Sequence, residues 1–485
     1  MVTTRSYDLV ILGGGAAAFA ALTEASRRGL STALVNTGLP IGGTCVNVGC
    51  IPSKHLLAVG ETAAASSENP FEAVQYSDDE PTVDWPTALD GTTDLVEQFR
   101  RENYVDVAEH FETDTYEGYG QLVDDTTIEV VDGADEGARI TGEKLLVATG
   151  SSPREPPIDG LGEVDYYTSE TILEERELPE RIVMLGGGYI ALEWGQILHR
   201  VGVDVTVLQR SDRVLSDTEG QLGREIQRAF EEDGIELVTR NDFQCVYAAA
   251  ADGGADTVQS GVAVETIVDG TERTVTGDAL FVATGVQPNS EGVGLDTVGV
   301  ETDDDGTIRV DEHFQTTNPD VYAAGDVIGE PELETVAAKE GNHAVKNAFG
   351  GEGVSIDYDA VPAVVFTSPE VATVGTTERE YMDEHGTCSC RTIRMEDVPR
   401  AKTVENTDGL VQVVKHHETD EIVGVHMVGP RAADTIVEAT LAVKFGLTVD
   451  DIVDTVHPFP TFSEAFKHAC QAFRRDTSAM SCCVE

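Results

Sequence analysis

Two stretches of the 485-residue chain share one local pattern, which restricts the fold more than any other feature. Each has an apolar run, then glycines, then small and apolar residues: "YDLVILGGGAAAFAALTEASRRG" from residue 7 and "RIVMLGGGYIALEWGQILHRVG" from residue 181. The spacing G-x-G-x-x-A is formed by Gly13, Gly15 and Ala18 and again by Gly186, Gly188 and Ala191. Such glycines allow a tight strand-to-helix turn whose N–H groups can bind a pyrophosphate. One match is weak evidence, but two in this context predict two dinucleotide sites.

The strand that follows each turn indicates which dinucleotide is bound. An acidic residue at its end would accept hydrogen bonds from a ribose 2′-OH, whereas arginines would pair with a 2′-phosphate. Arg210 and Arg213 follow the second of these strands and predict NADPH rather than NADH. Asn36 ends the first, where flavin-binding folds of this type often carry Glu. Asn36 can hydrogen-bond a ribose only without charge, so a prediction of FAD depends on other segments.

Three further segments supply that support. The apolar runs "LLVATGSSPR" and "LFVATGVQPN" each end on Ala-Thr-Gly, which makes Thr149, Gly150 and Gly285 candidates for cofactor contact. The run "NPDVYAAGDV" ends on Asp326, whose carboxylate could accept hydrogen bonds from the ribityl hydroxyls of a flavin.

The order of these patterns predicts an α/β fold with two Rossmann-like nucleotide-binding domains, followed by an α+β domain. Beyond about residue 350, alternating apolar strands precede two helical stretches, which favours an antiparallel sheet with helices. The predicted boundaries are 1–152 for the FAD domain, 153–280 for the NADPH domain, 281–350 for a segment completing the FAD domain, and 351–485 for the C-terminal domain.

Charge excludes some classes of partner. The chain has 88 Asp and Glu against 32 Lys and Arg, a formal net charge of -56. Such a surface repels nucleic acid and anionic membranes, and it resembles proteins of halophiles, where concentrated salt screens the repulsion. No apolar run of membrane-spanning length or signal peptide is evident, so we expect a cytoplasmic protein. The eight unevenly spaced cysteines are then expected to be reduced, catalytic or metal-binding.

The stretch "GGTCVNVGCIPSK" contains a candidate redox pair, Cys45 and Cys50. In a regular helix residues five apart are separated by about 7.5 Å along the axis, so the turn between them must be distorted for the sulfurs to meet. The surrounding glycines permit this distortion, and a helix N-terminus with nearby Lys54 is expected to lower the thiol pKa values. Gly43, Thr44 and Lys54 are further candidates for cofactor contact.

These motifs together resemble the FAD-dependent pyridine nucleotide disulfide reductases over essentially the whole chain. The resemblance implies that Cys50 lies next to the flavin, that Cys45 faces the substrate, and that Lys54 pairs with Glu193 beneath the isoalloxazine. It also implies a homodimer in which the C-terminal domain of each subunit completes the active site of the other.

Members of this family that reduce disulfides carry a catalytic His–Glu pair in a segment of the form H-x-x-P-T-x-x-E or close to it, and the resemblance places the base directly before the Pro-Thr pair. This chain has "HPFPTFSEA", with Phe459 at the expected position of the base. His457 lies two residues earlier, and we interpret it as a structural histidine. A phenylalanine cannot transfer a proton, and this favours a substrate whose reduction delivers no proton to it.

Within the family the chain is similar to mercuric reductases, which reduce Hg(II) to Hg(0). The similarity lies in "GGTCVNVGC", in "GGGYIALE" with Tyr189, in "VPRAKTVENTDG" and in the vicinal pair Cys482 and Cys483 near the C-terminus. It implies that Tyr189 covers the nicotinamide face of the flavin, although simple packing is an alternative. It further implies that Cys482 and Cys483 collect Hg(II) and pass it to the Cys45/Cys50 pair of the partner subunit.

Two other functions stay open on the sequence alone: a disulfide reductase for a small thiol, and a redox sensor that binds metal without turnover. The remaining cysteines are less informative. Cys388 and Cys390 could bind metal together with His385, but an incidental cluster is the more common outcome. Cys245 and Cys470 are expected to be buried.

Overall fold

The computed structural model describes residues 4–65, 70–71, 82–250, 260–329 and 331–475. The chain forms two compact units. The first comprises residues 1–55, 89–154 and 285–356. The second comprises residues 56–88, 155–284 and 357–485.

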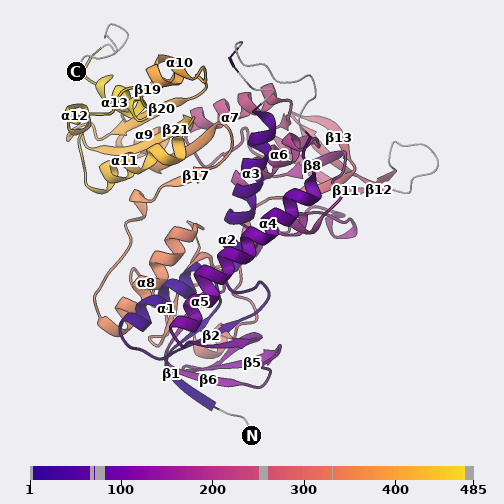
Figure 1. Ribbon diagram of the computed structural model, residues 1–485, viewed down its shortest axis with the longest axis vertical. Helices are drawn as coiled ribbons and strands as arrows, with labels where there is room; N and C mark the ends of the chain where they lie inside the picture. Colours follow the sequence, from indigo (N-terminus) through magenta and orange to yellow (C-terminus); the bar gives the residue numbers. More distant parts are fainter. Residues whose placement is uncertain (1–3, 66–69, 72–81, 251–259, 330, 476–485) are drawn as a thin grey trace. The chain divides into compact units, whose positions relative to one another are not determined.

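The first unit is built on a mixed seven-stranded sheet (Figure 1). Its strands are β1 (Thr4–Leu12), β2 (Thr32–Asn36), β3 (Asp114–Glu117), β4 (Tyr119–Asp124), β5 (Thr127–Asp132), β6 (Arg139–Val147) and β16 (Val321–Ala323). The order is β3-β2-β1-β6-β5-β4, with β16 paired to the C-terminal end of β6. Strands β1, β2, β3, β6 and β16 are parallel, whereas β4, β5 and β6 pair antiparallel. The sheet therefore combines a parallel core with an antiparallel edge.

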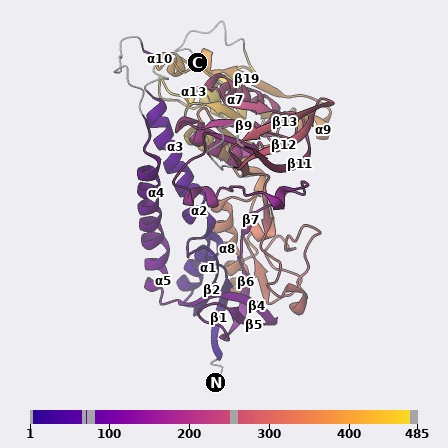
Figure 2. The same cartoon turned by 90° about the vertical axis from the view of Figure 1, so that its right-hand side faces the viewer.

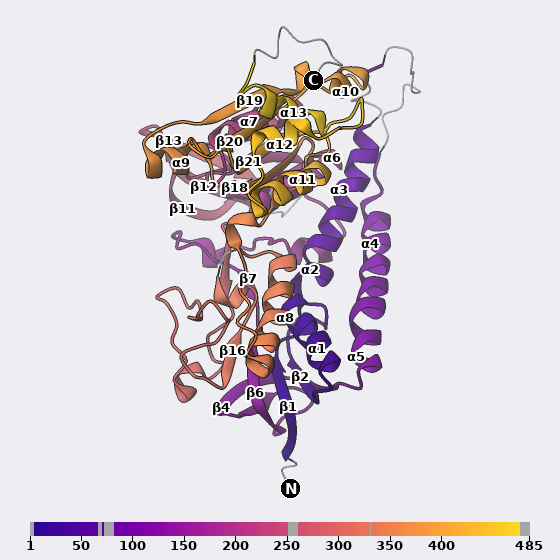
Figure 3. The same ribbon diagram turned by 90° about the vertical axis from the view of Figure 1, so that its left-hand side faces the viewer.

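Helices α1 (Ala16–Arg27) and α8 (Glu334–Gly350) lie side by side in this unit (Figure 3). Their close approach depends on Gly341, because a Cβ there would lie 2.0 Å from the carbonyl oxygen of Ala17. The other elements along these segments are α2 (Gly43–Asn47), a π-helical turn (Arg101–Val105), α5 (Asp106–His110), β7 (Ser151–Pro153) and β15 (Val286–Pro288). Two helices are divided between the units: α3 (Cys50–Ala64) belongs to the second unit from residue 56 on, and α4 (Trp85–Arg100) belongs to the first from residue 89 on. Strands β7 and β15 form a separate antiparallel pair.

The second unit contains the second glycine-rich stretch. Its parallel sheet has the order β10-β9-β8-β14, formed by β8 (Arg181–Leu185), β9 (Asp204–Leu208), β10 (Glu236–Val238) and β14 (Ala279–Val282). The helices of this part are α6 (Tyr189–Arg200) and α7 (Gly220–Asp233). The segment between β10 and β14 forms a separate antiparallel sheet. Its strands are β11 (Asn241–Ala250), β12 (Ser260–Val268) and β13 (Thr271–Gly277), which are adjacent in that order (Figure 2).

The C-terminal part of the second unit is an antiparallel sheet of order β17-β18-β21-β20-β19. Its strands are β17 (Ala363–Val365), β18 (Glu370–Gly375), β19 (Cys390–Arg394), β20 (Leu410–Lys415) and β21 (Ile422–Gly429). The accompanying helices are α9 (Glu378–His385), α10 (Pro399–Thr403), α11 (Ala432–Lys444), α12 (Val449–Asp454) and α13 (Glu464–Gln471). Residues of α11, α12 and α13 share one apolar core with the sheet, which includes Val413, Ile436 and Phe466.

The predicted fold class is confirmed: two strand–turn–helix units, the first on a mixed sheet and the second on a parallel sheet, are followed by an α+β domain. Within the described ranges, no helix is both long enough and apolar enough to traverse a lipid bilayer.

Candidate active site

The two candidate redox cysteines lie on consecutive helices rather than on one. Cys45 is in the short α2, and Cys50 is the first residue of α3. Between them Val48 leaves the helical conformation, with φ -140° and ψ 0°. Gly49 follows, and a Cβ at this position would lie 2.9 Å from the carbonyl oxygen of Thr44. The predicted distortion between the cysteines is therefore present, and a glycine is needed to pack it.

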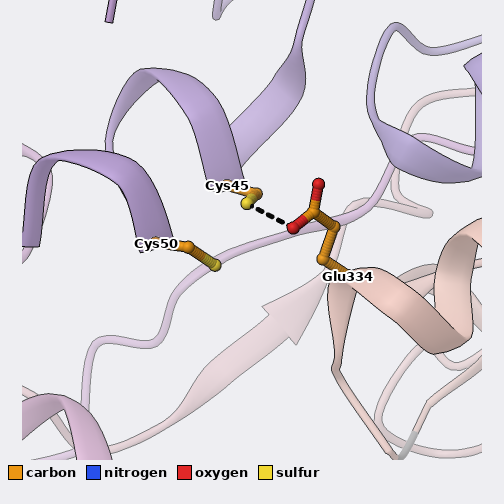
Figure 4. Close-up of side chains that lie close together, drawn as sticks. All are labelled: Cys45, Cys50 and Glu334. Carbon is orange, nitrogen blue, oxygen red and sulfur yellow. Dashed lines mark hydrogen bonds between the residues drawn. The ribbon is translucent and has the colours of Figure 1, made fainter. Parts of the chain in front are cut away.

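A carboxylate that the sequence did not indicate completes the cluster. The thiol of Cys45 donates a hydrogen bond to Oε2 of Glu334, with 2.7 Å between the heavy atoms (Figure 4). Glu334 is the first residue of α8, and its Oε1 accepts a longer bond of 3.5 Å from the hydroxyl of Tyr104. One ligand atom each from Cys45, Cys50 and Glu334 lies within 4.8 Å of the others. We call these three residues the redox cluster.

The electrostatics of the redox cluster differ from the prediction. The pKa of Cys45 is raised, not lowered, because the thiol is hydrogen-bonded with Cys50, because burial disfavours the thiolate, and because Glu334 adds a nearby negative charge. The pKa of Tyr104 is also raised, first by burial and then by Glu334. The prediction of a lowered thiol pKa was wrong for Cys45, since it counted Lys54 and the helix N-terminus but not the neighbouring Cys50 thiol, the burial of the sulfur or the carboxylate from α8.

The first glycine-rich turn is packed against the redox cluster's own segment. Gly13 has φ +126°, and a Cβ there would lie 2.0 Å from the carbonyl oxygen of Ala148. Similarly, a Cβ on Gly43 would lie 2.7 Å from the Cα of Gly15. The N-terminus of α1 has no side-chain cap at Gly15, so its first N–H groups are available to an anion. This fits the pyrophosphate of a dinucleotide next to the start of α2.

Asn36 lies over the same turn, where its Oδ1 would be 2.6 Å from a Cβ on Gly14. Its Nδ2 donates to the carbonyl of Leu39 at 2.9 Å. The side chain is therefore held in place at the end of β2, beside the turn that the sequence assigned to FAD.

The other predicted FAD contacts lie where strands of the first unit end. Asp326 accepts a 2.7 Å hydrogen bond from the hydroxyl of Ser151, a residue that the sequence did not indicate. The hydroxyl of Thr149 donates to the carbonyl of Asn289 at 2.7 Å, and Asn289 N donates to the carbonyl of Gly150 at 2.9 Å. These bonds join the two Ala-Thr-Gly segments, and the N–H of Arg154 bonds the carbonyl of Gly285.

The second glycine-rich turn repeats the geometry of the first. A Cβ on Gly186 would lie 2.1 Å from the carbonyl oxygen of Ala283, and Gln209 lies over Gly187 as Asn36 lies over Gly14. The N-terminus of α6 again has a glycine, Gly188, and no side-chain cap. The equivalence of the two turns was the strongest prediction from the sequence, and the geometry bears it out.

The two arginines after β9 differ in their surroundings. Arg213 donates to the carbonyl oxygen of Ser216 at 2.7 Å and pairs with Asp212 at 3.2 Å. Two nitrogens of its guanidinium group are therefore already bonded within its own loop. Arg210 is exposed. Of the two, Arg210 is the better candidate for a bound phosphate.

The remaining predicted residues of α6 have contrasting environments. Tyr189 begins the helix and is 43% exposed. Glu193 is buried, and its Oε1 accepts a 3.0 Å bond from the N–H of Phe366. Lys54 is half-buried in α3. The predicted pair of Lys54 with Glu193 joins the two units and stays a prediction.

His457 has a partner outside the segment in which it was noticed. Its Nε2 is 2.8 Å from Oε1 of Glu438 on α11, its side chain is almost fully buried, and this carboxylate raises its pKa. The interpretation of His457 as a structural histidine agrees with this environment. Phe459 is 52% exposed.

Three further cysteines can be compared with their predictions. Cys470 is buried as predicted. The prediction for Cys245 was wrong, because this residue is half-exposed with its sulfur 3.5 Å from Oε2 of Glu265. Cys388 pairs with Glu378 rather than with His385, at 2.8 Å. Cys482 and Cys483 lie outside the described residues.

Comparisons with known proteins agree with this architecture. Residues 7–341 match the pyridine nucleotide-disulphide oxidoreductase family, and residues 361–470 match the dimerisation domain of the same family. A mercuric reductase from Lysinibacillus sphaericus is 38% identical over 486 residues, covering 100% of this chain and 86% of the relative. A mercuric reductase from Streptomyces lividans is 40% identical over 479 residues, covering 99% of this chain and 98% of the relative.

A solved structure has the same fold at lower identity. It is the Cu(II) complex of the HOCl-induced flavoprotein disulfide reductase RclA from Escherichia coli. The TM-score is 0.84 at 22% identity, over 96% of this chain and 99% of that one. At this identity the likeness supports the fold alone.

Proposed function

Since this chain belongs to the pyridine nucleotide-disulphide oxidoreductases, we propose that it reduces Hg(II) to Hg(0) with electrons from NADPH, through FAD and the Cys45/Cys50 pair. The observation that carries the proposal is the redox cluster, in which two thiols and a carboxylate lie within 4.8 Å of one another. Thiolates are the preferred protein ligands of soft cations. The relatives named mercuric reductases, 38% and 40% identical over almost the whole chain, support this substrate.

The chain's residues fit the two cofactors of such an enzyme. FAD would be held at the first glycine-rich turn, with Asn36 and Asp326 as polar contacts, and NADPH at the second. When bound, FAD relays the electron pair of NADPH to the cysteines, so that NADPH and Hg²⁺ give NADP⁺, H⁺ and Hg(0). The uncapped N-termini of α1 and α6 support both sites.

The protein's own residues would handle protons when the metal arrives. Each thiol that binds Hg(II) must lose its proton. Oε2 of Glu334 already accepts the hydrogen bond of the Cys45 thiol at 2.7 Å, so it is placed to receive that proton as the metal takes the sulfur. The raised pKa of Cys45 keeps the reduced thiol protonated until then.

The C-terminal domain supports a metal rather than a disulfide as the substrate. Phe459 occupies the position at which the family's disulfide-reducing members have a base. The nearby His457 does not replace that base, because its ring is hydrogen-bonded to Glu438 on α11. The domain is a dimerisation domain, so we further propose a homodimer in which Cys482 and Cys483 of one subunit deliver Hg(II) to the Cys45/Cys50 pair of the other.

The activity is tested with the purified protein, NADPH and thiol-buffered HgCl₂ in concentrated salt. We expect NADPH oxidation that depends on Hg(II) and is matched by release of elemental mercury. Oxidation of NADPH by lipoamide or oxidised glutathione at a comparable rate would indicate a disulfide reductase. Binding of Hg(II) without turnover would indicate a sensor.

The nucleotide is tested by Arg210→Gln. If Arg210 binds the 2′-phosphate, the KM for NADPH should rise by about tenfold, the worth of one charge-assisted hydrogen bond, while the KM for NADH stays unchanged. Equal changes for both nucleotides would contradict the assignment.

Delivery across the interface is tested in a mixed dimer. One subunit carries Cys45→Ala and Cys50→Ala, and the other carries Cys482→Ala and Cys483→Ala. Each parent homodimer should be slow with thiol-buffered Hg(II), whereas the hybrid keeps one site with both pairs intact and should recover about half of the activity. A hybrid as slow as its parents would exclude transfer between subunits.

A further inference from the structure

A second group of thiols and a carboxylate lies in the C-terminal domain. The sulfurs of Cys388 and Cys390 are 3.2 Å apart, and the Cys388 thiol donates to Oε1 of Glu378 at 2.8 Å. The ligand atoms of all three residues lie within 4.8 Å of one another. We call these residues the α9 cluster, because Glu378 begins α9 and the cysteines follow the end of that helix.

The carboxylate of the α9 cluster is oriented before any ion binds. Its second oxygen, Oε2, accepts a 3.0 Å hydrogen bond from Nε2 of Gln412, a fully buried residue of β20. The helix N-terminus does not use this carboxylate, because Thr377 and Glu380 form a reciprocal capping box there. Glu378 therefore directs its other oxygen, Oε1, to the thiol of Cys388. Protein ligands of metals are commonly oriented by such hydrogen bonds from behind.

The loop that carries the cysteines is fixed as well. Ser389, between them, accepts a backbone hydrogen bond from Lys415 N at 2.9 Å, and β19 begins at Cys390 in register with Val414 of β20. The Oε1 atom of Gln412 is buried and has no hydrogen-bond partner in this structure. A buried polar atom without a partner is uncommon in native proteins, and this one belongs to the side chain that supports Glu378.

We propose that Glu378, Cys388 and Cys390 bind a divalent cation of the zinc type, separate from the redox cluster. Two thiolates and one carboxylate are ligands that Zn²⁺ accepts, and a water would fill the fourth tetrahedral position. With Zn–S bonds of about 2.3 Å, tetrahedral geometry sets two sulfurs about 3.8 Å apart. The observed 3.2 Å needs only a small side-chain rotation to reach that separation. The net charge of -56 also favours a cation at this surface.

The site joins three pieces of the domain. Glu378 comes from the start of α9, the cysteines from the loop before β19, and the supporting amide from β20. Binding would thus hold the α9–β19 connection to the sheet, and it should stabilise the folded domain by mass action.

The test uses the full chain with Cys45, Cys50, Cys482 and Cys483 replaced by Ser, which removes the competing thiols and makes turnover irrelevant. The reduced protein is equilibrated with ZnCl₂ and dialysed, and its metal content is measured. We expect one zinc per subunit and a higher Tm with zinc. With Co²⁺ instead, we expect the thiolate-to-cobalt absorption band of a tetrahedral site.

Adding Cys388→Ser and Cys390→Ser should abolish the zinc, the cobalt band and the Tm increase. The matched control is Cys245→Ser, which removes a single half-exposed thiol next to Glu265 and should keep all three signals. Equal zinc content in the parent and the Cys388/Cys390 variant would overturn the proposal. A reduced parent protein that retains no zinc after dialysis would also overturn it.

A third variant covers the case in which the double substitution prevents folding. Glu378→Gln keeps both thiols and the hydrogen bond partner for Gln412, and it should weaken zinc binding by about tenfold or more while the cobalt band persists with altered intensity. Zinc affinity equal to that of the parent would remove Glu378 from the site and contradict the proposal.

Discussion

The redox cluster and the α9 cluster contain the same ligand atoms on different backbones. In each, two thiols and one glutamate lie within 4.8 Å of one another, and one of the thiols donates a hydrogen bond to the carboxylate, at 2.7 Å in the first and 2.8 Å in the second. In the redox cluster the cysteines are separated by four residues and a glycine-dependent break between two helices, and the carboxylate lies 289 residues away in the sequence. In the α9 cluster all three residues fall within thirteen positions of the chain.

This difference indicates different chemistry. The segment of the redox cluster packs on the first glycine-rich turn, where Gly43 meets Gly15, so its sulfurs belong to a nucleotide-binding unit. The α9 cluster lies in a helix-to-strand connection of the dimerisation domain. Identical donor atoms are thus proposed to serve electron transfer in the first setting and static coordination in the second.

The largest expected effect separates the clusters by activity. Cys45→Ala or Cys50→Ala should lower Hg(II)-dependent NADPH oxidation by at least about 100-fold, equivalent to about 2.7 kcal/mol of activation free energy. Cys388→Ala with Cys390→Ala should leave the rate close to that of the parent. A comparable loss in the second variant, with its fold intact by circular dichroism, would show that the clusters are not functionally distinct.

One glycine near each cluster tests how much the cluster depends on its backbone. In Gly49→Ala the new Cβ would meet the Thr44 carbonyl at 2.9 Å and Cys45 Cα at 3.2 Å, so the sulfurs must shift and turnover should fall by about tenfold or more. Gly386 ends α9 with φ +68° and open space around it, so Gly386→Ala should cost only about 1 kcal/mol of unfolding free energy. Rate assays and urea unfolding of both variants measure the contrast. Unchanged turnover in Gly49→Ala would show that the break does not position the pair.

The two glutamates should differ in their influence on Cys45. Cys50 and burial are the main causes of the raised pKa of this thiol, and Glu334 adds to them, so Glu334→Gln should lower that pKa and more thiolate should be present at neutral pH. The rate of alkylation by iodoacetamide of the reduced enzyme, followed against pH, reports the shift. Glu378→Gln is the matched control, and its profile should coincide with the parent's. A Glu334→Gln profile that moves to higher pH would contradict the assigned role.

The smallest expected effect concerns the support of Glu334. The hydroxyl of Tyr104 donates a long hydrogen bond of 3.5 Å to Glu334. Tyr104→Phe should therefore weaken the stabilisation of this carboxylate by less than about 1 kcal/mol, and it should shift the alkylation profile by only a few tenths of a pH unit. A shift as large as that of Glu334→Gln would mean that Tyr104, rather than the carboxylate, controls the thiol.

Local patterns in the sequence predicted the fold and the turns well. Gly13 and Gly186 were identified by their spacing alone, and both contact a carbonyl that only a glycine can approach. The reason is that the strand, turn and helix that produce this contact are adjacent in the chain. The same holds for the break between Cys45 and Cys50, which depends on the glycine between them.

Contacts between distant segments could not be predicted in this way. Glu334 and Ser151 have no motif of their own, and their roles appear only when α8 and β7 are placed, because their partners lie 289 and 175 residues away in the sequence. The error in the Cys45 pKa has this origin only in part, since Cys50 and burial are the larger causes of the raised pKa and the carboxylate from another segment adds to them. Cys245 was misplaced because an alternating strand does not reveal which of its faces is covered.

Strand β16 has a consequence for how the chain is made. Val321–Ala323 pairs with Leu145–Val147, whose side chains are at most 1% exposed in the finished sheet. During synthesis the ribosome must add 173 further residues after Val147 before it reaches Val321. Until then this edge of β6 is an unpaired apolar strand, the type of edge on which nascent chains aggregate. We therefore expect chains released before residue 321 to depend on chaperones, whatever the condition of the catalytic residues they already contain.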